Sequence, residues 1–215
     1  MEGSEGEGRT IEQVPNKLTI TVLGSRYSGK TTLLNSLIFP KIIQNNNYTR
    51  TYGYDIRFLS INDNILIKFF DIGDVELDSN ESVFQEMSWY SHYIIYVIDS
   101  KIKESLSYIS SFEDVFKKNN LVLIFTKLDQ VKNDKNFYLN NSDVKKFIKD
   151  FNINNIFYVN SLDENSIKDL KQGLFDLIQN DLNKKIFTNI RPDDFDKNPI
   201  LFHRAVVDKS RRIGC

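Results

Sequence analysis

The stretch Gly24-Ser-Arg-Tyr-Ser-Gly-Lys-Thr31 decides the fold, because it fits the pattern G-x-x-x-x-G-K-[ST]. The β-branched run 18–23 precedes it and an apolar segment with helical spacing follows it, so the sequence predicts a strand, a loop and a helix. Glycine at positions Gly24 and Gly29 would let the backbone curl its N–H groups around phosphate oxygens at the start of that helix. The motif therefore predicts a site for a nucleoside diphosphate or triphosphate.

The side chains of this loop add specific contacts to the predicted site. Lys30 would place a positive charge on the β- and γ-phosphates, and the hydroxyl of Thr31 could ligate Mg²⁺. We expect the rest of the loop and the first helical turn to contact the nucleotide through Ser25, Arg26, Tyr27, Ser28 and Thr32. The expected ligands are thus a nucleotide and a magnesium ion.

Apolar runs alternate with segments of helical spacing along the rest of the chain. Further strands are expected at 54–61, 65–70, 93–98, 121–125 and 155–159, the last three compact enough to be buried on both faces. Helices are expected at about 103–117, at 142–150 with Ser142 as its N-cap, and at 166–181. This alternation predicts an α/β sheet with right-handed crossovers.

Composition and charge limit the classes of function. With 28 basic and 29 acidic residues the net charge is −1, which argues against a generally basic nucleic-acid-binding protein. The 215 residues favour one ordinary domain, and no apolar run is long enough to cross a bilayer. We expect a disordered arm at 1–16, a folded domain at 17–184 and an irregular tail at 185–215.

A second motif, Thr126-Lys-Leu-Asp129, follows the run 121–125 at a strand end, where ligands of open α/β sheets bind. The Asp129 carboxylate could accept both the ring N–H and the exocyclic amine of guanine, a donor pair that adenine lacks. The stem of Lys127 could lie over the flat base. Together, Thr126, Lys127 and Asp129 predict selection of GTP over ATP, which disfavours a P-loop kinase or ATPase.

With two further motifs, the chain over about residues 17–182 resembles the Ras-like small GTPase superfamily, as a divergent member similar to the Rab and Arf-like branches. Thr51-Tyr-Gly53 is similar to the T-x-G of switch I, Asp71 stands where the strand-end aspartate of switch II belongs, and Thr126 to Asp129 is similar to N-K-x-D. The stretch that contains His92 is similar to a Rab and Arf stretch that does no chemistry, so His92 is expected to be a structural residue. The resemblance implies the P-loop NTPase fold of small G proteins, a six-stranded, mostly parallel sheet flanked by about five helices.

The resemblance also implies ligands and partners. GTP or GDP would bind with Mg²⁺, and the cation would be held by Thr31, Thr51 and Asp71. Effector and exchange-factor proteins would bind through the switch regions, and no nucleic-acid partner is expected. The chain would then act as a molecular switch in vesicle trafficking or a related process.

The stretch Tyr158-Val-Asn-Ser-Leu162 is similar to the last motif of the family, usually S-A-x, in which a backbone N–H meets the guanine carbonyl oxygen. The register of this motif is open, because either Asn160-Ser161 or Ser161-Leu162 could occupy the S-A pair. Ser161 and Leu162 are therefore both candidate nucleotide contacts.

Switch II departs from the family, which reads D-x-x-G-Q where this chain reads Asp71-Ile-Gly-Asp74-Val75. The N–H of Asp74 could still contact the γ-phosphate, but its carboxylate would repel that charged group unless the side chain turned away. Val75 stands where the family has the Gln that orients water, and valine cannot orient water. We therefore expect slow or impaired intrinsic hydrolysis of GTP.

The phosphate loop departs from the family as well, because Arg26 and Tyr27 are bulky where Ras and Rab proteins have small residues. Arg26 could act as a built-in arginine finger, which makes Arg26 and Asp74 the candidate catalytic residues. The alternative to a switch is a pseudo-GTPase, a scaffold or binding module locked in one nucleotide state or free of nucleotide. Arg26, Tyr27, Asp74 and Val75 favour that alternative, whereas the switch is favoured by the intact Lys30, Thr31, Thr51 and Asp129.

The segment Lys209-Ser-Arg-Arg-Ile-Gly-Cys215 places a thiol behind three basic residues, similar to the prenylated tails of Rab proteins. Cys215 is therefore a candidate for a geranylgeranyl anchor, and the alternative is a plain exposed thiol. The expected location is the cytoplasm, with peripheral attachment to the cytosolic face of a membrane if Cys215 carries the lipid.

Overall fold

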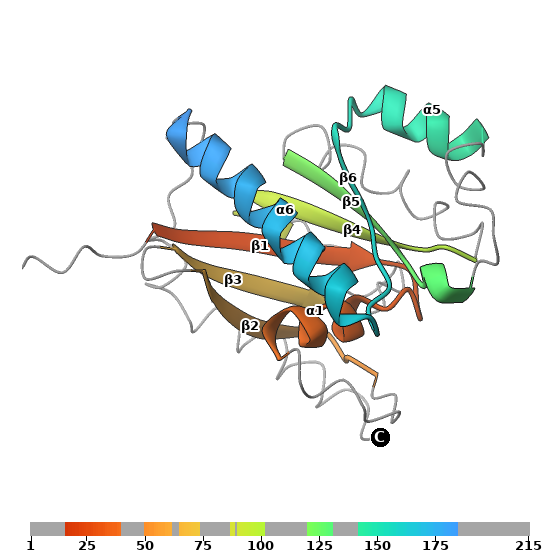
Figure 1. Cartoon of the computed structure of the whole chain (residues 1–215), viewed down its shortest axis with the longest axis horizontal. Helices are drawn as coiled ribbons and strands as arrows, with labels where there is room; N and C mark the ends of the chain where they lie inside the picture. Colours follow the sequence, from red (N-terminus) through yellow and green to blue (C-terminus); the bar gives the residue numbers. More distant parts are fainter. Residues whose placement is uncertain are drawn as a thin grey trace, which may run out of the picture.

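A six-stranded sheet with the strand order β2-β3-β1-β4-β5-β6 forms the centre of the protein (Figure 1). The structure, a computed structural model, describes residues 16–39, 50–61, 65–73, 87–88, 90–101, 120–130 and 142–184. The strands are β1 (Asn16–Gly24), β2 (Tyr54–Ile61), β3 (Ile65–Ile72), β4 (Tyr93–Asp99), β5 (Asn120–Thr126) and β6 (Asn155–Tyr158). All neighbouring pairs are parallel except β2 and β3, which confirms the predicted sheet.

The bounds of three α-helices and one short 3₁₀ helix are defined within these ranges. They are α1 (Lys30–Ile38), η2 (Leu128–Gln130), α5 (Ser142–Asp150) and α6 (Glu164–Asn183). None of the helices in the described part combines the length and the apolar character needed to span a membrane.

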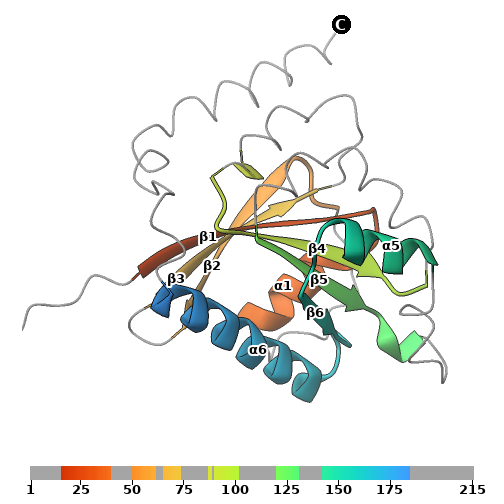
Figure 2. The same ribbon diagram turned by 90° about the horizontal axis from the view of Figure 1, so that it is seen from above.

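Apolar side chains on the two faces of the sheet form two separate cores. Along β4, Tyr93, Ile95 and Val97 join one core, and the alternate residues join the other, because successive strand residues point to opposite faces. The first core includes the apolar residues of α1 and α6, and the second includes those of α5. Figure 2 shows α1 and α6 together beneath the strands. The helices thus cover both faces, as an α/β sheet requires.

Most predicted elements are confirmed with small shifts at their ends. The helix predicted at 142–150 has those bounds, but Ser142 is its first residue rather than its N-cap. The last helix extends two residues beyond 166–181 at each end. Its earlier start is explained by Asp163, whose carboxylate accepts the N–H of Ser166 and caps the helix.

The prediction that all three late strands are buried on both faces is correct for β4 and for the run 121–125 of β5, and wrong for β6. Residues of β4 are buried throughout, whereas those of β6 are half-buried or exposed. The reason is position, because β6 is an edge strand that pairs only with β5. The helix expected at 103–117, the turn at 62–64 and the terminal segments 1–15 and 185–215 lie outside the described residues.

The parallel register brings the predicted motifs to one edge of the sheet. In the pairing, Val22 is opposite Asp71, Gly24 is opposite Val97, and Asp99 is opposite Thr126. All of these residues lie at or near the carboxyl ends of their strands, which is the edge where open α/β sheets bind ligands.

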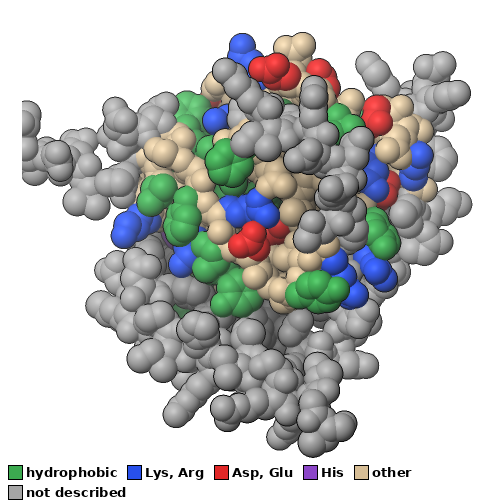
Figure 3. Space-filling view, turned by 90° about the horizontal axis from the view of Figure 1, so that it is seen from below, with side chains coloured by type: hydrophobic (Ala, Val, Ile, Leu, Met, Phe, Trp, Pro, Cys, Tyr) green, Lys and Arg blue, Asp and Glu red, His purple; other side chains and the backbone are tan. Residues whose placement is uncertain are grey.

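The surface carries both signs of charge. Figure 3 shows basic and acidic side chains next to each other near the middle of the face seen from below, with apolar side chains around them. The large apolar side chains that are exposed include Tyr27, Tyr52, Ile56, Phe58 and Leu162.

His92 has the structural role predicted for it. It precedes β4 at the edge opposite the phosphate loop. The ring nitrogen Nδ1 of His92 accepts the backbone N–H of Thr19 at 3.0 Å, and the backbone N–H of His92 donates to the Thr19 carbonyl at 2.8 Å. Burial lowers the pKa of His92 to about 4 from the usual 6.5. The imidazole is therefore neutral in the folded protein at neutral pH and helps to join β4 to β1.

This burial predicts a pH dependence of stability. Because the pKa of His92 is lower in the folded protein, the unfolded chain binds the proton first as the pH falls. The free energy of unfolding should therefore fall between pH 6.5 and pH 4, and His92 should contribute about 3 kcal/mol to this loss. Urea unfolding between pH 7 and pH 4.5 measures this. His92→Asn, whose Oδ1 can accept the same N–H but does not titrate, should flatten the slope in this window. An unchanged slope would contradict the assignment.

Candidate functional site

The phosphate loop between β1 and α1 has the curled backbone that its glycines predict. Gly24 has φ +151°, and a Cβ there would lie 2.3 Å from the carbonyl oxygen of Val97 on the neighbouring strand. Gly29, just before α1, has φ +90°, a conformation that side chains other than glycine rarely adopt. The two glycines are therefore required by close backbone approach at one position and by conformation at the other.

Lys30 lies inside the curl of this loop. Its side chain is buried, and Nζ donates to the carbonyl oxygens of Gly24 at 2.9 Å and Ser25 at 3.0 Å. The ammonium group thus bridges the start of the loop and the start of α1. This places a full positive charge where the loop would surround phosphate oxygens.

The predicted base-binding motif is tied directly to the phosphate loop. The Thr126 hydroxyl donates to the Ser28 carbonyl at 2.6 Å, so threonine makes the link that joins the end of β5 to the loop. Lys127 Nζ donates to the Tyr27 carbonyl at 2.6 Å and pairs with Asp99 Oδ2 at 2.7 Å. Lys127 was predicted to cover a base with its stem, and the structure shows that its ammonium group also bridges β4 and the phosphate loop.

Asp99 is a site residue that sequence reasoning missed. It is buried at the end of β4, and its Oδ1 accepts the N–H of Lys101 at 2.9 Å while Oδ2 holds Lys127. The available signal was a carboxylate directly after the apolar run 93–98, at the same edge as the other motifs.

Tyr27 has a backbone conformation that the tie to Lys127 stabilises. Its φ is 60°, in the left-handed region, which costs a residue with a side chain about 1 kcal/mol. Its ring is exposed and lies 4.8 Å below the guanidinium carbon of Arg26. Arg26 therefore stacks at the rim of the loop.

Asp129 is exposed in η2, directly after the tied residues Thr126 and Lys127. On the far side of the site, the Ser161 carbonyl accepts the Ser36 hydroxyl of α1 at 2.8 Å. The N–H of the exposed Leu162 is already accepted by the side chain of Asn160 at 3.0 Å. Two loops that would flank a base are thus anchored to the loop and helix that would hold the phosphates.

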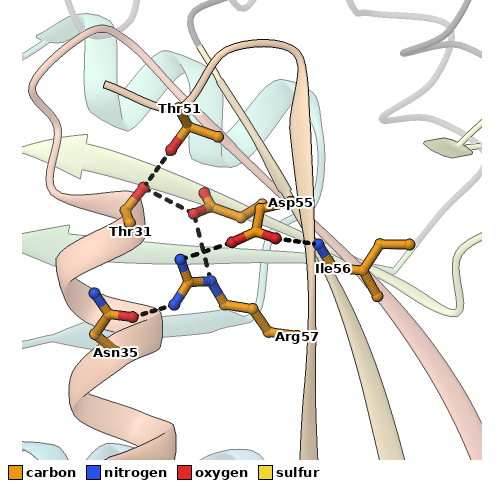
Figure 4. A network of polar contacts seen from close by, with 7 residues as sticks. Thr31, Asn35, Thr51, Asp55, Ile56 and Arg57 are labelled. Atoms are coloured by element: carbon orange, nitrogen blue, oxygen red, sulfur yellow. Dashed lines mark hydrogen bonds and ion pairs between the residues drawn. The ribbon is translucent and has the colours of Figure 1, made fainter. Parts of the chain in front are cut away.

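The three predicted metal ligands are brought together from separate elements. The Thr31 hydroxyl donates to Asp71 Oδ2 at 2.7 Å and lies 3.0 Å from the Thr51 hydroxyl (Figure 4). Asp71 is fully buried, and its other oxygen, Oδ1, has no hydrogen-bond partner among the described residues. Two hydroxyls and a carboxylate with an unsatisfied oxygen are hard donors that fit Mg²⁺.

Burial raises the pKa of Asp71, and the hydrogen bond from Thr31 and the charges of Arg57 and Lys30 oppose the shift. Arg57 on β2 is the second site residue that sequence reasoning missed. Its terminal nitrogens donate to Asn35 Oδ1 and, at 2.9 Å, to Asp55 Oδ2. The signal was the spacing of two along β2, which puts Asp55 and Arg57 on one face.

Gly73 joins the segment before β2 to the segment after β3. Its N–H donates to the Gly53 carbonyl at 2.8 Å, and a Cβ on Gly73 would lie 2.2 Å from the Thr51 carbonyl oxygen. The absence of a side chain at Gly73 therefore allows Thr51 to reach Thr31.

Three other predicted site residues have no described contact with the phosphate loop or with the cluster of Thr31, Thr51 and Asp71. Thr32 is exposed on α1, and Asp74 and Cys215 lie outside the described residues. No contact of the latter two is therefore described.

The curled loop, the buried lysine and the hydroxyl–carboxylate cluster at the carboxyl edge of the sheet define a nucleotide-binding protein with the P-loop fold of small G proteins. The model of the Arf family, ADP-ribosylation factor family, matches residues 8–155, more than half of the chain, and the chain belongs to this family. This confirms the Ras-superfamily resemblance and identifies a small GTP-binding protein. Among curated proteins, no sequence matches the chain.

The close approach at Gly73 predicts a difference between two glycines. Gly73→Ala should lower the free energy of unfolding by about 3 kcal/mol, because its Cβ must displace the Thr51 backbone. Gly53→Ala should lower the free energy of unfolding by only about 1 kcal/mol. Its Cβ would have open space around it, so the φ of +71° is the source of the loss. Urea unfolding of both variants checks this, and equal losses would contradict the packing argument.

Proposed function

We propose that the chain is a guanine-nucleotide-dependent switch with slow intrinsic hydrolysis. The observation that carries the proposal is the meeting of the Thr51 and Thr31 hydroxyls with Asp71, from three different elements. A site of this kind can respond to a nucleotide, because Thr51 of switch I contacts Thr31 through hydroxyl groups that a cation would bridge.

Each part of the nucleotide has a proposed partner. The loop N–H groups and Lys30 bind the phosphates, and Thr31, Thr51 and Asp71 hold Mg²⁺. When bound, the cation neutralises charge on the β- and γ-phosphates. The orphaned Oδ1 of Asp71 and its burial support this assignment.

The base lies between the two anchored loops in this proposal. Asp129 accepts the ring N–H and exocyclic amine of guanine, and the stem of Lys127 covers the ring. Because the Leu162 N–H is already accepted by Asn160, we assign the contact with the guanine carbonyl to the N–H of Ser161. That assignment selects Asn160-Ser161 as the S-A pair.

The switch would operate through the segments next to β2 and β3. Gly73 and Gly53 share a hydrogen bond, so a change at Thr51 would also move the segment that follows β3. Loss of the γ-phosphate would remove one reason for Thr51 to stay near Thr31, and the surface offered to effectors and exchange factors would change. The family makes vesicle trafficking the proposed setting.

Slow hydrolysis follows from sequence changes and from one contact. Val75 cannot orient the attacking water, and in the family's arrangement the carboxylate of Asp74 would repel the γ-phosphate unless the side chain turned away. The stacking of Arg26 on Tyr27 at the rim of the loop supports the view that Arg26 is not a built-in arginine finger. The same changes favour a second candidate, a binding module that keeps one nucleotide state.

The location and domain bounds are proposed on the same basis. The folded domain is proposed to span 17–184, flanked by an arm at 1–16 and a tail at 185–215, and the described part of α6 ends with Lys184 as its C-cap. We propose a cytoplasmic protein with peripheral membrane attachment through a prenylated Cys215. Intact-mass analysis of protein from its native cell would detect the lipid, and an unmodified Cys215 would exclude it.

Base selection is tested by competition among unlabelled nucleoside diphosphates for a fluorescent GDP. The wild-type chain should prefer GDP to ADP. Asp129→Asn should weaken GDP binding about 10- to 100-fold, because an acceptor of two hydrogen bonds is lost. The same variant should gain affinity for xanthosine diphosphate, whose carbonyl can accept from the new amide. Equal binding of GDP and ADP by the wild type would overturn guanine selection.

Hydrolysis is tested by single turnover of bound GTP with Mg²⁺. The wild-type rate should lie below about 10⁻⁴ s⁻¹. The double variant Asp74→Gly/Val75→Gln should be at least about tenfold faster, because it restores the water-orienting side chain and removes the carboxylate. Arg26→Ala serves as the matched control and should leave the rate unchanged. Prompt wild-type hydrolysis that is lost in Arg26→Ala would instead make Arg26 the catalytic residue.

A further inference from the structure

Two carboxylates face each other across β2 and β3. Asp55 and Asp71 are directly opposite in the antiparallel pair, an arrangement in which like charges repel. Asp55 is exposed and can be solvated, but Asp71 is fully buried. A buried carboxylate needs a nearby positive charge or several hydrogen bonds.

Arg57 is close to both of these carboxylates, and Figure 4 shows its guanidinium beside Asp55 and Asn35. Its Nη2 pairs with Asp55 Oδ2 at 2.9 Å, and its Nε lies 3.8 Å from Asp71 Oδ2. Asn35 on α1 accepts from the remaining terminal nitrogen, so both ends of the guanidinium are held. The arginine is therefore fixed with its Nε edge towards Asp71, and it carries a permanent charge.

The pair between Arg57 and Asp71 is close but incomplete. Arg57 Nε is buried without a hydrogen-bond partner, and so is Asp71 Oδ1, among the residues that the structure describes. A distance of 3.8 Å is long for a hydrogen bond but short for attraction between charges. Asp71 thus keeps an oxygen for another cation while a first positive charge is already beside it.

We propose that Arg57 is an internal counter-cation that competes with Mg²⁺ for Asp71. Arg57 balances the buried carboxylate when the divalent cation leaves, and its charge weakens the binding of that cation when it returns. This inference rests on the proposed nucleotide and Mg²⁺ site, and it names what sets the strength of that site. Because Mg²⁺ and nucleotide binding are linked, Arg57 also eases release of the nucleotide.

The first test measures how much Mg²⁺ is needed to retain a fluorescent GDP. Arg57→Gln, which removes the charge, should lower the Mg²⁺ concentration for half-maximal retention by roughly tenfold. Arg57→Lys keeps the charge and should stay within about threefold of the wild type, which separates charge from packing. An Arg57→Gln variant that needs the same or more Mg²⁺ than the wild type would overturn the competition.

The second test needs no nucleotide. Urea unfolding in EDTA compares the effect of Arg57→Gln in the wild-type and Asp71→Asn backgrounds. Arg57→Gln should shift the unfolding equilibrium constant roughly tenfold more when Asp71 is present, as expected for a coupled pair. Equal effects in both backgrounds would overturn the counter-charge role. Failure of the wild type to retain guanine nucleotide at any Mg²⁺ concentration would instead overturn the proposed function, while this cycle would still decide the pairing.

Discussion

The site depends on the hydroxyl of Thr31, which is the point where three elements meet. This hydroxyl belongs to the first turn of α1, donates to Asp71 at the end of β3, and lies against the hydroxyl of Thr51 before β2. Its position follows from the curl of the phosphate loop, which in turn needs Gly24 to pass close to Val97. A displaced loop would separate Lys30 from the three oxygens proposed to hold the cation.

The base side of the site is fixed by a second set of bonds to the same loop. Lys127 spans the gap between Asp99 and the Tyr27 carbonyl, and Thr126 holds the Ser28 carbonyl. These bonds hold the loop where Tyr27 has a left-handed backbone conformation. The end of β5 and the phosphate loop are therefore joined by several hydrogen bonds, whereas Thr51 contacts Thr31 through its hydroxyl.

The charge of the buried Asp71 carboxylate is balanced by few neighbours. The buried carboxylate has one hydrogen bond from Thr31 and a permanent cation at Arg57 that does not reach bonding distance. If the site holds a divalent cation as proposed, Arg57 would lower the cost of losing it, because removing a partner from a buried charge is costly. In the proposed switch, the same charge would weaken the binding of the cation and so favour exchange of the nucleotide.

The sequence by itself determined the fold class and the phosphate loop, because glycine requirements, strand alternation and helical spacing are local properties. The three candidate metal ligands came from the resemblance to small GTPases. It also placed His92 outside the chemistry. Only the tertiary structure decided that Asp99 holds Lys127, that Arg57 lies beside Asp71 and that Gly73 packs on Thr51. The hydrogen bond between Ser36 and Ser161, which lie 125 positions apart in the sequence, was likewise visible only in the tertiary structure. Such contacts depend on which strands are neighbours and in what register, and a linear pattern does not specify either.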